Sequence, residues 1–431
     1  MNIDIDNILA HTSLRTHYGK TKNITGMMIE ATGIHAKIGD ICNITSVDED
    51  SSVLAEVVGF RDDNILLMAY NAIKGIGPGS IVESTGRRLR VPVGDELVGR
   101  TIDVTGRPID GLGEIHTTDF YDVDGESVNP LDRPRITEVM QYGVKAIDGL
   151  LSIGKGQRMG IFAGSGVGKS TLLGMIAKNV KADINVIALV GERGREVKEF
   201  IEKDLGEEGL KRSILVVATS DQPALFRVKC AAVATAIAEY FKDKGNDVLL
   251  MMDSLTRFAM AQREIGLAIG EPPIARGYTP SIYSELPKLL ERSGNFKTGS
   301  ITGIYTVLVE GDDTNEPISD TVRGIIDGHI VLSRDFAGRN HFPAIDINAS
   351  VSRLMNDIVS DEHKQVASRI RNMLALYYQN YDLITIGAYK QGLNIKLDEA
   401  VSKIDQINSF LKQGVNEFSS FEDTLKLMKS I

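Results

Sequence analysis

Cysteine is scarce in this chain. Only Cys42 and Cys230 occur among its 431 residues, and they lie far apart in the sequence. A small secreted domain held together by several disulfides needs more cysteines than this, so that class of protein is excluded. We expect no disulfide framework and a reducing compartment, for which the cytoplasm is the default.

Long apolar runs are also missing. No stretch approaches the roughly 20 apolar residues that a membrane-spanning helix needs. Residues 1–20 lack a basic region followed by a long apolar stretch, so they do not resemble a signal peptide. We therefore expect any association with a membrane to come through partner proteins.

An excess of positive charge is the third feature that the chain lacks. Its 48 Lys and Arg residues face 58 Asp and Glu residues, which gives a formal net charge of −10. Binding of nucleic acid without sequence preference needs a positive surface, so we expect no nucleic-acid partner. None of the seven histidines is paired at the spacing of metal ligands, and we expect no zinc site.

The patterns that are present divide the chain into four segments. After a tail (residues 1–24), residues 25–91 carry short apolar runs separated by turns, which is typical of a small β-barrel. In residues 92–355, apolar and often β-branched runs alternate with helical patterns, which predicts a parallel sheet covered on both faces by helices. Residues 356–431 have apolar residues at helical spacing, and we expect a helical C-terminal domain.

A phosphate-binding loop is the strongest signal in the third segment. It follows an apolar strand, opens a helix, and consists of Ala163, Gly164, Ser165, Gly166, Val167, Gly168, Lys169, Ser170 and Thr171. Glycines in such a loop let backbone N–H groups surround phosphates, and the helix N-terminus adds a favourable dipole. We expect Lys169 to contact the β- and γ-phosphates of ATP and the Ser170 hydroxyl to ligate Mg²⁺.

Two carboxylates follow other predicted strands. Asp253 ends the run DVLLMMD, and a carboxylate there can hold Mg²⁺ through water. Glu192 lies in VGERGREV, just past the run INVIALVG, where it could polarise an attacking water. Taken alone, GERGRE could equally be a solvated charged loop, and the same alternative applies to Arg193 and Arg195.

Longer blocks of sequence resemble a known family. They are GERGREV, VLLMMDSLTRFAMAQREIGLAIGEPP, RGYTPS, LPKLLERSGN, VLVEGDDTNEPISD and HFPAIDINASVSRL. The chain resembles the type III secretion ATPases from about Gly26 to its C-terminus, and the flagellar export ATPases most of all. These are relatives of the catalytic subunit of rotary ATP synthases. The resemblance implies a β-barrel, a RecA-like P-loop ATPase core and a helical C-terminal domain.

The resemblance also implies roles for four residues outside the P-loop. The family's catalytic glutamate corresponds to Glu192, and its inter-subunit arginine finger corresponds to Arg353 in SVSR. A guanidinium supplied across an interface would couple assembly to turnover. Arg257 in DSLTRF matches an active-site arginine of the rotary relatives, with an intramolecular salt bridge as the competing interpretation. Phe342 corresponds roughly to a position that stacks on adenine, although a lone aromatic is more often part of the core.

The partners that we expect follow from the same resemblance. It implies a homohexamer with Mg²⁺·ATP at subunit interfaces, located in the cytoplasm at the inner face of the cell membrane. It further implies a stator-like regulator, a central stalk protein, an export gate, and export substrates or their chaperones. The N-terminal tail, which binds the regulator in the family, is shorter here than in some flagellar relatives.

Three alternatives remain open at this point. A catalytic subunit of a rotary proton-translocating ATP synthase would assemble into an alternating ring of two chain types. A Rho-type RNA translocase also places a barrel before a RecA-like core, but residues 1–90 lack an aromatic and basic stripe for RNA. A nucleotide-binding scaffold without turnover would not depend on Glu192. Whether the cargo belongs to a flagellum or an injectisome is also open.

Overall fold

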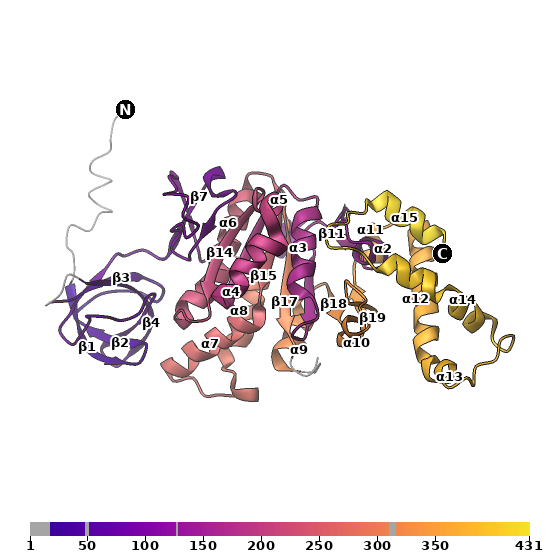
Figure 1. The fold of residues 1–431 in the computed structure, drawn as a ribbon. Coiled ribbons are helices and arrows are strands. Elements are labelled where there is room, and N and C mark those ends of the chain that lie inside the picture. The colour runs from indigo at the N-terminus through magenta and orange to yellow at the C-terminus, as the bar shows by residue number, and fades with distance from the viewer. Residues whose placement is uncertain (1–17, 48–50, 126–127, 310–315) are drawn as a thin grey trace, which may run out of the picture.

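The computed structural model of the chain describes residues 18–47, 51–125, 128–309 and 316–431. A β-barrel, a large sheet with its helices, and a helical C-terminal part follow one another in chain order and lie in a row (Figure 1). The predicted fold class is thereby confirmed. Residues 1–17 of the predicted tail, and residues 310–315 within VLVEGDDTNEPISD, lie outside the described residues.

The barrel closes in the strand order β1-β2-β5-β4-β3-β6. Its strands are β1 (Tyr18–Thr25), β2 (Met28–Thr32), β3 (Ile41–Thr45), β4 (Ser52–Arg61), β5 (Asn64–Ala69) and β6 (Ile81–Ser84). Alternate residues such as Ile29 and Ala31 on β2, or Cys42 and Ile44 on β3, form its buried interior. Strand β1 takes in residues 18–24, which the sequence analysis assigned to the tail, and β6 ends at Ser84.

The central sheet has the order β19-β18-β12-β17-β15-β13-β14-β8, and the short strand β16 pairs with β17. The strands are β8 (Thr101–Ile102), β12 (Arg158–Ala163), β13 (Ile184–Glu192), β14 (Ser213–Thr219), β15 (Asp247–Asp253), β16 (Gly294–Asn295), β17 (Ser300–Leu308), β18 (Gly328–Leu332) and β19 (Ile345–Ser352). Every neighbouring pair from β18 to β8 is parallel. Strand β19 is antiparallel to β18, a reversal at one edge that the sequence analysis did not predict.

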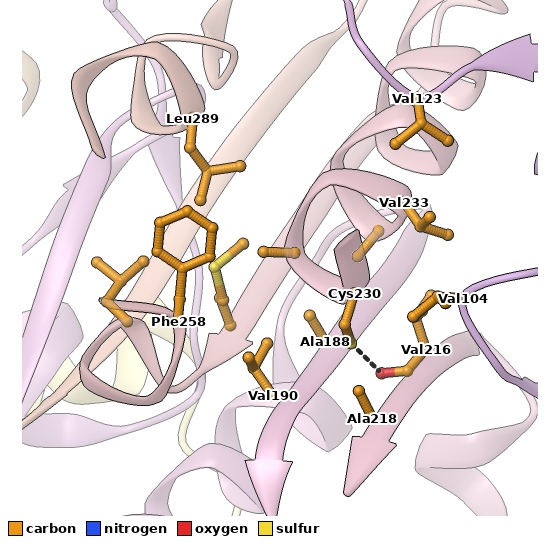
Figure 2. Packing of buried hydrophobic residues seen from close by; sticks show 14 of the residues in the cluster. Val104, Val123, Ala188, Val190, Val216, Ala218, Cys230, Val233, Phe258 and Leu289 are labelled. Atoms are coloured by element: carbon orange, nitrogen blue, oxygen red, sulfur yellow. Dashed lines mark hydrogen bonds between the residues drawn. The ribbon is translucent and has the colours of Figure 1, made fainter. Parts of the chain in front are cut away.

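Helices cover both faces of this sheet. On β15, Leu250 and Met252 belong to the core under α6 (Ala224–Asp243), α7 (Leu255–Ile269) and α8 (Pro280–Leu290). Leu249 and Met251 belong to the opposite core, which includes α3 (Lys169–Asn179). Figure 2 shows Cys230 of α6 facing the sheet, with its thiol 3.3 Å from the carbonyl oxygen of Val216. Both cysteines are free and buried.

The C-terminal part consists of helices packed beside the β19 edge of the sheet (Figure 1). They are α11 (Met355–Ile358), α12 (Asp361–Gln379), α13 (Tyr381–Thr385), α14 (Ile395–Leu411) and α15 (Phe421–Lys429). The remaining short strands and helices are β7 (Arg90–Val93), β9 (Asp119–Asp122), β10 (Val139–Met140), β11 (Ile153–Gly154), α2 (Lys145–Leu150), α4 (Gly194–Glu199), a π-helical turn (Phe200–Leu205), α5 (Gly206–Leu210), α9 (Pro317–Ile325), α10 (Arg334–Gly338) and three 3-10 turns (Asp95–Leu97, Pro130–Asp132 and Ala275–Gly277). Among the helices described, none is both long and apolar enough to cross a bilayer.

Candidate nucleotide-binding site

The P-loop connects the end of β12 at Ala163 to the start of α3 at Lys169. Within it, Gly166 and Gly168 have φ angles of +78° and +87°. Residues that carry a Cβ rarely adopt this left-handed backbone conformation. The N-cap residue of α3 is Gly168, which has no side chain to cap the helix, so the first N–H groups are suited to bind an anion. The loop therefore has the backbone shape that phosphate binding requires.

Lys169 and Asp253 form an ion pair at the carboxyl edge of the sheet. The Lys169 ammonium contacts Asp253 Oδ1, and both side chains are largely buried. Thr306, on the intervening strand β17, donates a hydrogen bond of 2.7 Å to the same carboxylate oxygen. Ser170, the next residue in the chain, is exposed. The structure thus brings together the lysine and the strand-end carboxylate that the sequence analysis selected.

A bulge at the end of β13 orients Glu192. The pairing of β13 with β14 shifts by one residue between Val190 and Glu192, and Gly191 between them has a φ of +68°. A methyl group on Gly191 would lie 3.1 Å from Cβ of Arg257. Only glycine fits both the positive φ and this close approach, so Gly191 sets the direction in which Glu192 leaves the strand.

Glu192 is a buried carboxyl beside other charged groups. Its side chain is buried, and its Oε1 has no hydrogen-bond partner among the described residues. Burial and the negative charge of Asp253 raise the pKa of Glu192 to about 7, against the opposing positive charges of Lys169 and Arg257. An unpartnered carboxyl oxygen with such a pKa has the character of a group that binds and polarises water.

The Arg193 and Arg195 side chains of the same motif have a different environment. Arg193 pairs with Glu196 at 3.0 Å and Arg195 with Glu199 at 3.4 Å, all on the exposed surface of α4. These are solvated ion pairs of the kind that contributes little to stability. The motif therefore divides into one buried carboxyl at the site and two surface arginines.

Arg257 approaches the same place from the first turn of α7. The Ser254 side chain caps this helix by accepting a hydrogen bond from the Arg257 backbone N–H at 3.3 Å. The Arg257 Nε is buried and has no partner among the described residues, and no ion pair of Arg257 forms with any of them. The salt bridge that the sequence left open as an alternative is therefore not present in the part of the chain that the structure describes.

Phe342 lies against the P-loop. Ring carbons of Phe342 would be 3.5 Å from a methyl group placed on Gly168, and the side chain is 41% exposed. The competing interpretation was that Phe342 is part of the core. A half-exposed ring beside a phosphate-binding loop does not fit that interpretation.

Arg353 lies at the amino ends of the parallel strands, whereas this cluster lies at their carboxyl ends. Ala163, which ends β12 at the P-loop, pairs with Leu332 at the carboxyl end of β18. Because β19 runs antiparallel, its last residue Ser352 pairs with Gly328 at the other end of β18. Arg353 follows directly, so within one chain it cannot reach the Lys169 side of the sheet.

Arg353 is an exposed residue whose hydrogen bonds are to backbone groups. Its backbone N–H donates to the carbonyl oxygen of Asp327 at 3.0 Å, and Nη2 donates to the carbonyl oxygen of Arg323 at 3.1 Å. No carboxylate pairs with it among the described residues. The charge is thus held at the surface by backbone contacts.

Sequence reasoning missed three residues of this site. Thr306 is detectable as a polar residue near the carboxyl end of a buried strand, and Gly191 as a glycine at a strand end. Gln413 lies after α14, and its backbone N–H donates to the carbonyl oxygen of Phe342 at 3.0 Å. No local pattern marks Gln413, because its partners are distant in sequence.

Comparison with known proteins finds related domains and relatives over nearly the full length of the chain. The nucleotide-binding domain of the ATP synthase alpha/beta family matches residues 143–352, and the β-barrel domain of that family matches residues 22–86. The T3SS EscN ATPase C-terminal domain matches residues 359–430. The flagellum-specific ATP synthase of Bacillus subtilis (strain 168) is 57% identical over 415 residues, which is 96% of this chain and 95% of that protein. This chain belongs to the family of flagellar and type III secretion ATPases.

Other relatives of this secretion ATPase indicate the same family. The type 3 secretion system ATPase of Xanthomonas euvesicatoria is 49% identical over 423 residues, covering 98% of this chain and 96% of that protein. The structure of the assembled ATPase EscN from the enteropathogenic E. coli type III secretion system has a TM-score of 0.90 and 46% identity, covering 96% of this chain and 99% of that one. The predicted family and the prediction of an ATP-hydrolysing enzyme are confirmed, and neither a rotary synthase subunit nor an RNA translocase is favoured.

Proposed function

We propose that this ATPase couples hydrolysis of Mg²⁺·ATP to protein export of the flagellar type, as a homohexamer with its sites at subunit interfaces. The observation that carries the proposal is the division of the site between two edges of the sheet. Lys169, Asp253, Glu192 and Arg257 gather at one edge, and Arg353 is exposed at the other. Two copies in a ring would bring the two edges together.

The residues at the carboxyl edge fit ATP and its metal. Uncapped N–H groups of α3 suit phosphate oxygens, and on binding Lys169 would exchange the Asp253 carboxylate for the β- and γ-phosphates. Mg²⁺ would be held by Ser170, by the phosphates and, through water, by Asp253, where it would neutralise charge that develops on the phosphates. No group of three carboxylate, His or Cys ligands occurs in the described ranges, which agrees with a metal that depends on the nucleotide for ligands.

Glu192 is the residue that we assign to water activation. Its Oε1 and the Nε of Arg257 are both buried without partners among the described residues. Buried atoms without partners cost free energy, and a water and a phosphate oxygen would satisfy them on binding. With water oriented by Glu192, its oxygen would attack the γ-phosphorus and its proton would pass to the Glu192 carboxylate. The bond to the ADP oxygen would break, and ADP and phosphate would leave.

Arg353 of a neighbouring subunit would supply the last charge. A planar guanidinium at the γ-phosphate offsets the negative charge that develops there. Phe342, beside Gly168, would contact the adenine. One relative supports the assembly: the structure of EscN is described as that of the assembled ATPase, and a second as EscN in complex with its central stalk EscO.

The partners of this chain follow from the family in the same way. We infer a central stalk protein, a stator-like regulator, an export gate, and export substrates or chaperones. The ATPase would work in the cytoplasm, held at the inner face of the cell membrane by the export apparatus. The C-terminal helices beside β19 are the part that subunit movements would displace.

Dependence of turnover on assembly tests the proposal. ATPase rate per chain should rise steeply with protein concentration, because an isolated chain lacks Arg353 at its own site. Glu192→Ala should abolish turnover at every concentration. A rate per chain that stays constant down to concentrations where light scattering detects only monomers would contradict a shared site.

A further inference from the structure

The segment between α14 and α15, residues 412–419, joins the C-terminal helices to the nucleotide site. It is made of KQGVNEFS and has contacts with two other parts of the chain that lie near the P-loop and its helix. One is Phe342 beside the P-loop, and the other is the turn before α2, which itself lies close to the end of α3. These contacts are carried by a few identifiable side chains.

Gln413 holds the centre of this segment. Its side chain is buried, Oε1 accepts a hydrogen bond of 2.8 Å from the Lys145 backbone N–H, and Nε2 donates to the carbonyl oxygens of Gly143 at 2.7 Å and Glu417 at 2.8 Å. Its backbone N–H donates to the carbonyl oxygen of Phe342. One amide side chain thus has its acceptor and donor sides occupied, by groups from both domains.

The Gln413 partners lead to both ends of the phosphate-binding helix. The Phe342 ring lies beside Gly168, immediately before α3. Gly143 has a φ of +71°, and a methyl group there would lie 2.7 Å from the Phe418 ring and 2.8 Å from Cβ of Asn179, the last residue of α3. The segment therefore contacts structures next to the first and last turns of α3.

A peripheral ion pair supports the same segment without touching Phe342. Lys145 Nζ lies 3.0 Å from Glu417 Oε1, and Glu417 Oε2 accepts from the Gly414 backbone N–H at 3.0 Å. The Glu417 side chain is 49% exposed, so solvent screens the pair. The buried amide contacts of Gln413 are consequently the stronger constraint.

We propose that Gln413 is a positioning residue that sets the place of Phe342 beside the P-loop, so that the C-terminal domain controls affinity for the base side of the nucleotide. The inference rests on the proposed contact between Phe342 and adenine. Any movement of the C-terminal helices that displaces residue 413 loosens Phe342 and weakens the hold on the base, while the phosphate contacts of the P-loop are retained.

Steady-state kinetics of Gln413→Leu test this, at protein concentrations where the rate per chain has reached its plateau. Leu keeps much of the volume but removes all three side-chain hydrogen bonds. We expect KM for ATP to rise roughly three- to tenfold, the range for losing one such positioning contact, with kcat changed by less than about twofold. The inhibition constant of Mg²⁺·tripolyphosphate, which has no base, should stay unchanged.

Two further variants make the outcome decisive. Gln406→Leu makes the same substitution on α14 and should leave KM unchanged. Among the described residues, the Gln406 side chain donates to the carbonyl oxygen of Ser430 at 3.1 Å and accepts from Lys403 Nζ at 3.2 Å. Gln413→Glu keeps the acceptor for Lys145 N–H but loses both donors, and it replaces Gln413→Leu if that variant does not fold. It should raise KM in the same direction.

Phe342→Ala separates failure of this inference from failure of the proposed function. If Phe342→Ala leaves KM for ATP unchanged, the adenine contact itself is wrong. If Phe342→Ala raises KM but folded Gln413 variants do not, the coupling through Gln413 is wrong. An equal rise in the tripolyphosphate inhibition constant would also overturn the inference, because the damage would then reach the P-loop. Combining Gln413→Leu with Phe342→Ala should raise KM by less than the product of the separate effects.

Discussion

Replacing Glu192 with Gln should stabilise the nucleotide-free protein at alkaline pH. The substitution keeps the size of the side chain and removes a buried negative charge that lies beside Asp253. In the folded chain these two causes, burial first, raise the pKa of Glu192 from 4.5 to about 7. The folded protein therefore holds this proton more tightly than the unfolded chain does.

The sign and size of the effect follow from that difference. Stability contributed by the protonated carboxyl is fully present below about pH 4.5 and is lost as the pH rises through 7. Each pKa unit corresponds to about 1.4 kcal/mol, so above pH 8 the ionised Glu192 costs the folded state at most about 3 kcal/mol. Gln carries no such cost at any pH.

Thermal unfolding without nucleotide, at pH 5 and pH 8.5, measures this difference. Glu192→Gln should melt at a higher temperature than the unsubstituted protein at pH 8.5 and close to it at pH 5. Glu199→Gln is the matched control, because Glu199 lies on the exposed face of α4 paired with Arg195. If the Glu192→Gln protein is no more stable than the unsubstituted one at pH 8.5, the ionised Glu192 carboxylate does not destabilise the folded state and this reasoning is refuted.

Two further substitutions test the geometry around Glu192 and Asp253. Gly191→Ala should destabilise the protein by about 1–3 kcal/mol and lower kcat, because of its positive φ and the approach of Arg257. Gly194→Ala, with nothing close to the added methyl, should do neither, and equal melting temperatures for both would contradict the bulge. Thr306→Val should raise the Mg²⁺ concentration for half-maximal ATPase rate several-fold, by removing the hydrogen bond that orients Asp253. An unchanged Mg²⁺ dependence would show that Asp253 needs no such support.

The fold could be predicted from sequence wherever the signal was local. The apolar runs that end at Ala163 and Asp253 are strands, and the helix that begins at Lys169 follows the P-loop as the motif requires. Strand β1 was missed because YGKTKNIT is polar and its alternation is weak, since the closed barrel buries only part of one face. The reversal of β19 was missed because strand direction depends on pairing, which no local pattern records.

Residues of the site that come together through long-range pairing could likewise not be placed from the sequence. Glu192 could be placed near Asp253 only through the register of β13 against β15, where Leu189 pairs with Asp253. The role of Arg353 was predicted only from the resemblance to a family. Its position at the far end of the strands could be seen only in the observed topology. Gln413 could not be predicted at all, because its hydrogen bonds reach residues 268 and 270 positions away in the chain.

Mixing two inactive variants tests the shared site most directly. Arg353→Ala chains retain Glu192 but offer no guanidinium to a neighbour, and Glu192→Gln chains retain Arg353 but cannot activate water. In a mixed ring, an Arg353→Ala chain whose neighbour is a Glu192→Gln chain regains a complete site. We predict ATPase activity in the mixture well above the sum of the two separate proteins. If both variants co-assemble and the mixture stays as inactive as its components, Arg353 does not act across the subunit interface.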